Sequence, residues 1–241
     1  MRLEQDCEFF LVKREGRWQQ IRFHDYAQIY NIPGLYERLF YDILKCDSPA
    51  VLRRELTRQL DLAQTPAHSL RVLDLGAGNG MVGEQLAELD VELLVGADIL
   101  PEAAQAARRD RAEVYDAYHV LDFTRLEESQ EAELRQQRFN CLSCVAALGF
   151  GDIPEEAFAT AFDLVRDGGW VAFTIKESFV LDSEQSEFAR LIEQMTARGA
   201  LEIRSQHRYR HRISTSGVPL HYVCYVGRKR HRIEPPDRII A

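Results

Sequence analysis

Between Leu70 and Ala197, short apolar runs alternate with longer stretches in which apolar residues recur every three or four positions. Short apolar runs are typical of buried strands, and the three-to-four-residue period is typical of amphipathic helices. Strands are predicted over residues 71–75, 92–97, 117–121, 139–145 and 170–175. Helices are predicted to begin near Gly80, Pro101, Glu127, Glu155 and Ser183. Strands that alternate with helices form a parallel sheet covered on both faces.

The pattern changes after residue 197. A last amphipathic helix is predicted over Glu187–Ala197, and two long strand-like runs follow at 200–214 and 219–228. They are joined by the turn-forming residues 214–217, with no helix between them. Strands joined in this way pair antiparallel, so we expect an antiparallel pair at one edge of the sheet.

A smaller unit is predicted ahead of this core. Residues 8–23 indicate a hairpin, which is marginal alone and must pack on something. Tyr26 and Tyr30 lie four apart, on one helical face, and we expect them to form a lid. Amphipathic helices are predicted over 36–44 and 51–60, the second with Ser48 as its cap and Pro49 at its first position. The expected division is a hairpin and helical cap at 1–69, a core at 70–232 and a tail at 233–241.

The composition is that of an ordinary globular protein, with 241 residues, 46% of them hydrophobic and 28% charged. The N-terminal residues do not resemble a signal peptide, and no apolar run approaches the roughly 18 residues of a membrane helix. We therefore expect a soluble, cytoplasmic protein. The five cysteines have no framework spacing, which argues against a secreted disulfide scaffold. The sequence leaves the oligomeric state open.

The net charge of −8 hides an asymmetry, because ten of the 30 Lys and Arg residues fall at or after Arg198, against three acidic residues. One interpretation is a pair of edge strands that charge protects from unwanted pairing. The alternative is a basic surface that faces phosphate, carboxylate or RNA.

Residues 72–80 carry the strongest chemical signal. They contain an apolar run with a carboxylate at Asp74, then glycines at 76, 78 and 80, then an amphipathic segment. This order predicts a strand, a tight turn and a helix. Glycine lets a ligand approach the backbone closely, and the free N–H groups of the new helix face the same space. Because a carboxylate would repel phosphates, Asp74 favours a ligand that carries an ammonium group.

Two further strands end in acidic residues. Asp98 follows the second strand, about 20 residues on, where a carboxylate can accept hydrogen bonds from both ribose hydroxyls. Asp122 follows the third strand and can accept from an exocyclic amine, while Phe123 beside it can cover a purine face. The glycine spacing differs from the G-x-G-x-x-G of dinucleotide sites, so an NAD oxidoreductase ranks last among the functions considered.

The D-L-G-A-G-N-G motif at 74–80, together with Asp98 and Asp122 after the next two strands, resembles the class I S-adenosylmethionine-dependent methyltransferases. The resemblance covers roughly residues 36–230. It implies a Rossmann-like α/β fold, with a seven-stranded, mostly parallel sheet, helices on both faces and an antiparallel last strand. An N-terminal hairpin and helical cap would precede this sheet.

Carried over by position, the resemblance implies that Asp74 and the turn backbone hold the methionine part of the cofactor. It assigns Asp98 to the ribose, Ile99 and Phe123 to the adenine faces, and Asp122 to the adenine amine. The loop after the fourth strand, residues 145–151, would border the transferred methyl group. The cofactor-binding residues expected on this basis are Asp74, Gly76, Ala77, Gly78, Gly80, Asp98, Ile99, Asp122, Phe123 and Val145.

Departures from the family patterns narrow the range of methyl acceptors that we expect. Residues 145–151 lack the N/D-P-P-Y/F motif of enzymes that methylate amino groups of DNA and RNA, and the double-glutamate loops of arginine methyltransferases are not evident. We therefore expect transfer from S-adenosyl-L-methionine to a small molecule, with S-adenosyl-L-homocysteine as product. The alternatives are a module that binds the cofactor without transfer, and an enzyme that acts on RNA or protein through the basic C-terminal strands. The residues that determine acceptor specificity are expected within 8–45, 145–153 and 176–222.

Methyl transfer depends mainly on alignment, and a base matters only if the nucleophile must lose a proton. None of the candidate bases is singled out by spacing; they are His24, Asp25, Tyr26, Tyr30, Glu177 and His221. Cys141 and Cys144 form a CxxC, but this spacing in a strand points the two side chains to opposite faces. The histidines show no ligand spacing either, so no metal site is expected.

Overall fold

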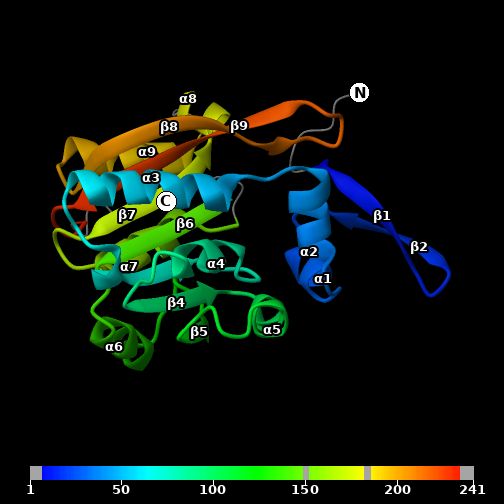
Figure 1. Ribbon diagram of the computed structural model, residues 1–241, viewed down its shortest axis with the longest axis horizontal. Helices are drawn as coiled ribbons and strands as arrows, with labels where there is room; N and C mark the ends of the chain where they lie inside the picture. The colour runs from blue at the N-terminus through cyan, green and yellow to red at the C-terminus, as the bar shows by residue number, and fades with distance from the viewer. Residues whose placement is uncertain (1–6, 149–151, 182–185, 234–241) are drawn as a thin grey trace.

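The computed structural model describes residues 7–148, 152–181 and 186–233, which form a central seven-stranded sheet and a smaller N-terminal unit beside it (Figure 1). The strand order across the sheet is β5-β4-β3-β6-β7-β9-β8. The strands are β3 (Arg71–Leu75), β4 (Leu93–Asp98), β5 (Ala117–Val120), β6 (Cys141–Leu148), β7 (Trp170–Lys176), β8 (Leu201–Ile213) and β9 (Pro219–Lys229).

The pairing confirms the predicted α/β fold. Strands β5, β4, β3, β6 and β7 pair parallel, and β9 pairs antiparallel with both β7 and β8. The two C-terminal strands are an antiparallel pair at one side of the sheet, as predicted. Strand β9 lies inside the sheet, so β8 alone forms that edge. The strand order reverses between β3 and β6, and ligands of open α/β sheets bind at such a switch point, beyond the carboxyl ends of the strands.

Helices cover both faces of the sheet. Helices α3 (Ser48–Leu62) and α4 (Met81–Ala87) pack on one face, and α7 (Glu155–Leu164) and α9 (Glu187–Ala197) pack on the other. Helices α5 (Pro101–Asp110) and α6 (Glu128–Gln136) connect the strands on the β5 side. Cys141 belongs to the cluster under α3, and Cys144 belongs to the cluster under α7. The prediction that these cysteines face opposite sides of the sheet is therefore confirmed.

Most predicted boundaries agree with the structure within one or two residues, but two elements of the core differ. Strand β6 continues to Leu148 rather than ending at Val145, with an irregularity after Cys144 at which Ala146 takes a positive φ of 56°. Helix α8 (Glu177–Leu181) was not predicted. The predicted helix start at Ser183 and the tail from residue 234 lie outside the described residues.

The N-terminal unit consists of the hairpin β1 (Phe9–Arg14) and β2 (Arg17–Arg22), then α1 (Tyr26–Tyr30), α2 (Leu35–Glu37) and a π-helical segment (Arg38–Ile43). The α-helix predicted over 36–44 is wrong in type over most of its length. The wider π-helical turn buries Leu39, Phe40 and Leu44 in one cluster while Tyr36 and Tyr41 line a cavity. Tertiary packing of these aromatic residues outweighs the local preference for an α-helix.

The helical cap predicted at Ser48 is also wrong. Asp47 precedes the helix, and Ser48 is the first residue of α3. The Ser48 hydroxyl lies 2.6 Å from both the Tyr209 hydroxyl and His211 Nδ1. It therefore forms its hydrogen bonds with side chains of β8 and does not cap the backbone of α3. This contact ties the start of α3 to the edge strand.

The N-terminal unit lies at the carboxyl end of the parallel strands, and the hairpin extends beyond α1 and α2 (Figure 1). It is attached to β8 by a buried ion pair in which Arg212 donates to Glu8 at 2.6 Å. Glu8 also accepts from the backbone N–H of Thr215 at 2.6 Å. Within the described parts of the chain, no helix has the length and apolar character needed to cross a bilayer.

Candidate functional site

The glycine turn between β3 and α4 is held firmly against the neighbouring strands. The backbone N–H groups of Gly76 and Ala77 both donate to the Ala97 carbonyl, at 2.8 and 3.0 Å. The Gly78 N–H donates to Asp98 Oδ2 at 3.0 Å, and the Tyr118 hydroxyl donates to the Gly78 carbonyl at 2.7 Å. Gly78 adopts a φ of 55°, a region that residues with a Cβ rarely occupy. The turn is therefore preorganised before any ligand binds.

Two cavities meet at this turn. The larger, here called the strand-end cavity, has a volume of about 390 Å³ and lies over the carboxyl ends of β3, β4 and β6 and the residues that follow β5. Six of the predicted cofactor residues line it: Gly76, Asp98, Ile99, Asp122, Phe123 and Val145. Ala77 and Gly78 line the second, smaller cavity, whereas Asp74 and Gly80 lie outside the described lining of both.

Asp98, at the end of β4, links the turn to the strand-end cavity. Its Oδ2 accepts from Gly78 and its Oδ1 accepts from the Leu100 N–H at 2.9 Å. Burial raises the pKa of this carboxyl group, and the backbone N–H donors act in the opposite direction. A carboxylate has about four lone-pair positions, so two such bonds leave capacity for hydroxyl donors of a ligand.

Asp74 lies beneath the turn rather than facing the cavity. Its oxygens accept from the Ser143 hydroxyl at 2.6 Å and from the Tyr115 hydroxyl at 2.7 Å. Burial raises its pKa to about 6, although both hydrogen bonds favour the charged form. The carboxylate thus supports the turn from below, and its contribution to holding an ammonium group stays a prediction.

The residues after β5 form the far end of the strand-end cavity. Asp122 accepts from the Thr124 N–H at 2.9 Å and from its hydroxyl at 2.6 Å, and these bonds lower the pKa of the carboxyl group. Phe123 is almost fully buried, whereas Ile99 is 57% exposed at the rim. A polar acceptor and two apolar side chains in the lining of one cavity suit a flat ring that carries an amine.

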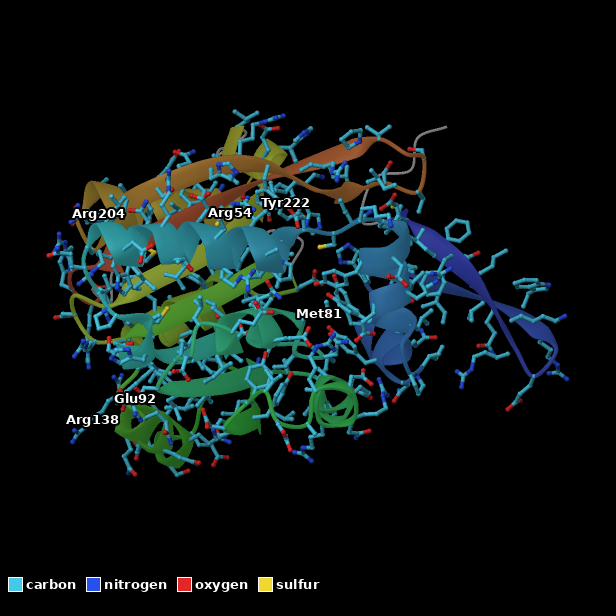
Figure 2. The ribbon with its side chains drawn as sticks, viewed as in Figure 1. Arg54, Met81, Glu92, Arg138, Arg204 and Tyr222 are labelled. Carbon is cyan, nitrogen blue, oxygen red and sulfur yellow. The ribbon has the colours of Figure 1, made fainter. Side chains whose placement is uncertain are left out.

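The smaller cavity, about 60 Å³, lies between the turn, the N-terminal unit and β8–β9. Figure 2 shows Met81, which lines it, at the junction between the sheet and α1–α2, and Tyr222, which lines it from β9, above Met81 in this view. Glu92 and Arg138 lie at the opposite end of the sheet in the same view. Buried polar groups from α3 and β8 form its inner end, where burial lowers the pKa of His211 to about 3.

Three tyrosines, here called the aromatic wall, line both cavities: Tyr26, Tyr30 and Tyr36. The Tyr30 ring centroid lies 6.1 Å from that of Tyr26 and 5.2 Å from that of Tyr36. A Cβ built on Gly78 would lie 2.5 Å from the Tyr30 hydroxyl oxygen, so this side chain packs directly on the turn. The wall thus occupies the position that was predicted for a lid.

The candidate bases separate into two groups. His24, Tyr26 and Tyr30 line the cavities, but burial raises the pKa of both tyrosines well above the ordinary value, which favours them as neutral donors. Glu177 and His221 lie outside the described lining of both cavities, and Glu177 is paired with Arg208 at 3.0 Å. Asp25 is paired with Arg22 at 2.8 Å.

One polar residue of the site was not singled out by sequence reasoning. Asp152 lines the strand-end cavity, and its Oδ2 lies 3.1 Å from His24 Nδ1. Its place within residues 145–153, expected to border the acceptor, was the available signal. Its partner lies 128 residues away in the chain, so the pair itself could not be recognised from spacing.

Part of the positive charge of the C-terminal strands lies inside the protein, where Arg212 and Lys229 are buried. Arg212 is paired with Glu8, and Lys229 donates to the carbonyls of Phe162 at 3.0 Å and Val165 at 2.8 Å. Burial lowers the pKa of Lys229 to about 8. Arg230 is paired with Glu202 on the exposed side of β8. Of these residues, Arg212 lies on the edge strand β8, Lys229 ends the inner strand β9, and Arg230 follows it. That charge protects the edge from unwanted pairing stays a prediction.

Comparison with known proteins places this site in context. The ubiquinone biosynthesis O-methyltransferase of Thiobacillus denitrificans is 26% identical over 111 residues, 46% of each chain. That of Alkalilimnicola ehrlichii is 32% identical over 106 residues, 43% of this chain and 40% of the relative. The chain thus spans less than half the length of the curated relatives that it matches.

A solved structure agrees with the fold. The N-methyltransferase NodS from Bradyrhizobium japonicum, in complex with S-adenosyl-L-homocysteine, superposes with a TM-score of 0.56 at 14% identity, over 87% of this chain and 98% of that chain. At this identity the similarity shows the fold alone. A family model described as a methyltransferase domain matches residues 47–215, more than half of the chain. The chain therefore belongs to the methyltransferase domain family.

Proposed function

We propose that this protein transfers a methyl group from S-adenosylmethionine to a small-molecule acceptor. The observation that carries the proposal is the meeting of Asp98, Asp122 and Phe123 around one cavity beside the glycine turn. Its volume of about 390 Å³ lies within the roughly 300–1,000 Å³ of small-molecule sites. The solved structure of NodS contains S-adenosyl-L-homocysteine, and the match to its fold supports the same cofactor here.

The chemistry of the lining suits each part of that cofactor. Asp98 accepts hydrogen bonds from the ribose hydroxyls, Asp122 accepts from the adenine amine, and Ile99 and Phe123 cover the adenine faces. The turn at residues 76–78 holds the methionine part, with Asp74 beneath it compensating the ammonium charge. Bound S-adenosylmethionine supplies an activated methyl group, and the protein supplies alignment.

A small acceptor is supported by the enclosure of the site and by the curated relatives. The aromatic wall separates the strand-end cavity from the smaller cavity, and both are bounded by the N-terminal unit. Both relatives are O-methyltransferases of ubiquinone biosynthesis. The internal pairing of Arg212 and Lys229 removes two cations that an RNA platform would use.

Calorimetry with S-adenosylmethionine, S-adenosylhomocysteine and NAD tests the cofactor. Asp98→Ala is expected to weaken binding of the first two by more than about tenfold, because hydrogen bonds to a charged acceptor are lost. Asp61→Asn, an exposed position on α3, is the matched control and should bind like wild type. Binding of NAD alone would contradict the proposal.

A second measurement separates an enzyme from a binding module. The protein is incubated with methyl-labelled S-adenosylmethionine and a metabolite extract, and labelled products are sought. Transfer of label to a small molecule supports the proposal. Tight cofactor binding with no transfer to any fraction favours a module that binds the cofactor without transfer. Transfer only to added RNA or protein favours an enzyme that acts on those macromolecules.

A further inference from the structure

His24 and Asp152 form a hydrogen-bonded pair at the strand-end cavity. His24 Nδ1 lies 3.1 Å from Asp152 Oδ2 and 3.4 Å from Oδ1, and both residues line the cavity. An imidazole whose Nδ1–H donates to a carboxylate carries its basic lone pair on Nε2. The carboxylate orients the ring and stabilises the imidazolium that forms when Nε2 takes a proton. This arrangement is suited to general-base chemistry.

The pair is positioned beside the glycine turn. Ile153, next to Asp152, packs on the turn so closely that a Cβ built on Gly76 would lie 2.7 Å from its Cδ1. His24 follows β2 and lines both cavities, and its ring meets that of Tyr26 edge-on with centroids 5.7 Å apart. The imidazole therefore stands where the space for the cofactor and the remaining space of the site join.

The charges of the residues that line the cavities limit which charge the acceptor can carry. Among the described residues that line the two cavities, Arg212 is the one Lys or Arg side chain, and it is already paired with the buried Glu8. A carboxylate or phosphate on the acceptor would lie near Asp152, with no unpaired Lys or Arg side chain in the described lining to balance it. The aromatic wall instead offers ring faces and neutral hydroxyl groups. The lining is thus complementary to a neutral, aromatic compound.

We propose that His24 is the general base of the methyl transfer, that Asp152 is its positioning residue, and that the acceptor is a neutral aromatic hydroxyl compound. This inference rests on the proposed function. The phenol oxygen forms its bond to the methyl carbon while the carbon–sulfur bond breaks, and the electron pair of that bond stays on sulfur as the thioether. The phenol proton passes to His24 Nε2 and then to water. A neutral phenol is a poor nucleophile, so removal of its proton is where a base contributes.

The test uses two acceptors that differ in their need for a base. Catechol is un-ionised at neutral pH, whereas the nitro group of 4-nitrocatechol makes its hydroxyl ionise at much lower pH. Formation of S-adenosylhomocysteine is followed with each acceptor. For His24→Gln we expect kcat with catechol to fall by at least about 100-fold, and kcat with 4-nitrocatechol to fall by less than about tenfold.

Asp152→Asn keeps the imidazole in place and provides the second variant. We expect the same selective loss of kcat with catechol, smaller in size, and little change in KM. The matched controls are His68→Gln and Asp61→Asn, both exposed; His68 stands before β3, at the amino end of the strands. Both controls should behave like wild type with both acceptors.

Equal losses with both acceptors in the His24 and Asp152 variants would show a structural role and overturn the base assignment. A wild-type protein that binds S-adenosylmethionine but methylates amines or extract metabolites and no phenol overturns the acceptor class alone. A wild-type protein that does not bind S-adenosylmethionine in calorimetry contradicts the proposed function, and this inference falls with it.

Discussion

Asp74 illustrates how one buried carboxyl group makes the glycine turn sensitive to pH. Burial raises its pKa from 3.8 to about 6. The folded protein therefore holds this proton more tightly than the unfolded chain does, and the stability of the fold decreases as the pH rises from about 4 to about 6. The difference corresponds to roughly 3 kcal/mol, which the fold carries at neutral pH as the cost of an ionised carboxylate beneath the turn.

Asp74→Asn keeps the size of the side chain and removes its ionisation. Between about pH 4 and pH 7 we expect the variant to lose less stability than wild type, by up to roughly 3 kcal/mol. Urea unfolding at several pH values measures the two curves. Parallel curves would mean that Asp74 does not titrate in this range.

At Gly78, the addition of a single Cβ atom is expected to lower the stability of the fold. Gly78→Ala adds a Cβ at a φ of 55° and 2.5 Å from the Tyr30 hydroxyl oxygen. Gly217→Ala is a matched control, because its φ is 79° and nothing lies within 4 Å of its Cβ position. We expect a loss of about 1–2 kcal/mol from the backbone at Gly217, and a larger loss at Gly78.

The additional loss of stability at Gly78, compared with Gly217, should be smaller in the Gly78→Ala, Tyr30→Phe double variant, because the clashing oxygen is removed. A double-mutant cycle by urea unfolding isolates this interaction. Additive effects of the two substitutions would show that Tyr30 does not pack on the turn.

At the scale of elements, the N-terminal unit is attached to the sheet through β8. The Leu44 carbonyl accepts from the Ile213 N–H at 2.8 Å, and the Asp47 N–H donates to the His211 carbonyl at 3.0 Å. The Glu8–Arg212 pair adds a buried contact between the hairpin and the same strand. These bonds hold the aromatic wall over the glycine turn, so β8 positions the site although few of its side chains line it.

The buried Glu8–Arg212 pair gives a prediction at this scale. Arg212→Met leaves an uncompensated carboxylate and is expected to cost about 3–5 kcal/mol, because a lone buried charge is strongly unfavourable. The exposed Arg208–Glu177 pair provides the control, and Arg208→Met should cost at most about 1 kcal/mol. Urea unfolding measures both.

The Glu8→Leu, Arg212→Met double variant removes both charges and should recover part of the loss. A double variant less stable than Arg212→Met would show that the carboxylate is stabilised by Thr215 alone. In that case the ion pair would not be what attaches the hairpin to β8.

At the scale of the whole molecule, the site exists only because distant segments meet. Its lining comes from residues 23–49, from the ends of β3, β4 and β6, from the glycine turn and the start of α4, from the residues after β5, from residues 152–157, and from β8–β9. A ligand held between the core and the N-terminal unit stabilises the assembled state of both. At 100 times its Kd, such a ligand adds about 2.7 kcal/mol to the free energy of unfolding.

We expect S-adenosylhomocysteine to raise the melting temperature with increasing concentration, and to slow hydrogen exchange at residues 76–80 and in α1 together. Helix α6, away from the cavities, serves as the internal reference. Protection confined to the glycine turn would mean that the ligand does not engage the aromatic wall.

Local patterns were sufficient to predict much of the fold and the cofactor side of the site. Hydrophobic period and turn chemistry are properties of neighbouring residues, so the five parallel strands, their helices and the glycine turn could be located from sequence. Asp98, Asp122 and Phe123 could be named because each lies at or just after the carboxyl end of a strand. The carboxyl ends of parallel strands meet at one edge, and this rule brings such residues together without further information.

The amino-acid sequence by itself thus determined the order of elements, the turn and the family resemblance. Tertiary structure alone decided the partners: Ser48 bonding to β8 rather than capping α3, Asp74 lying beneath the turn, and His24 meeting Asp152. The physical reason is that a polar side chain can bond either to the local backbone or to distant groups, and the groups buried beside it determine which bond forms. Those neighbours are set by packing across the whole chain, and the spacing of residues in the sequence carries no information about them.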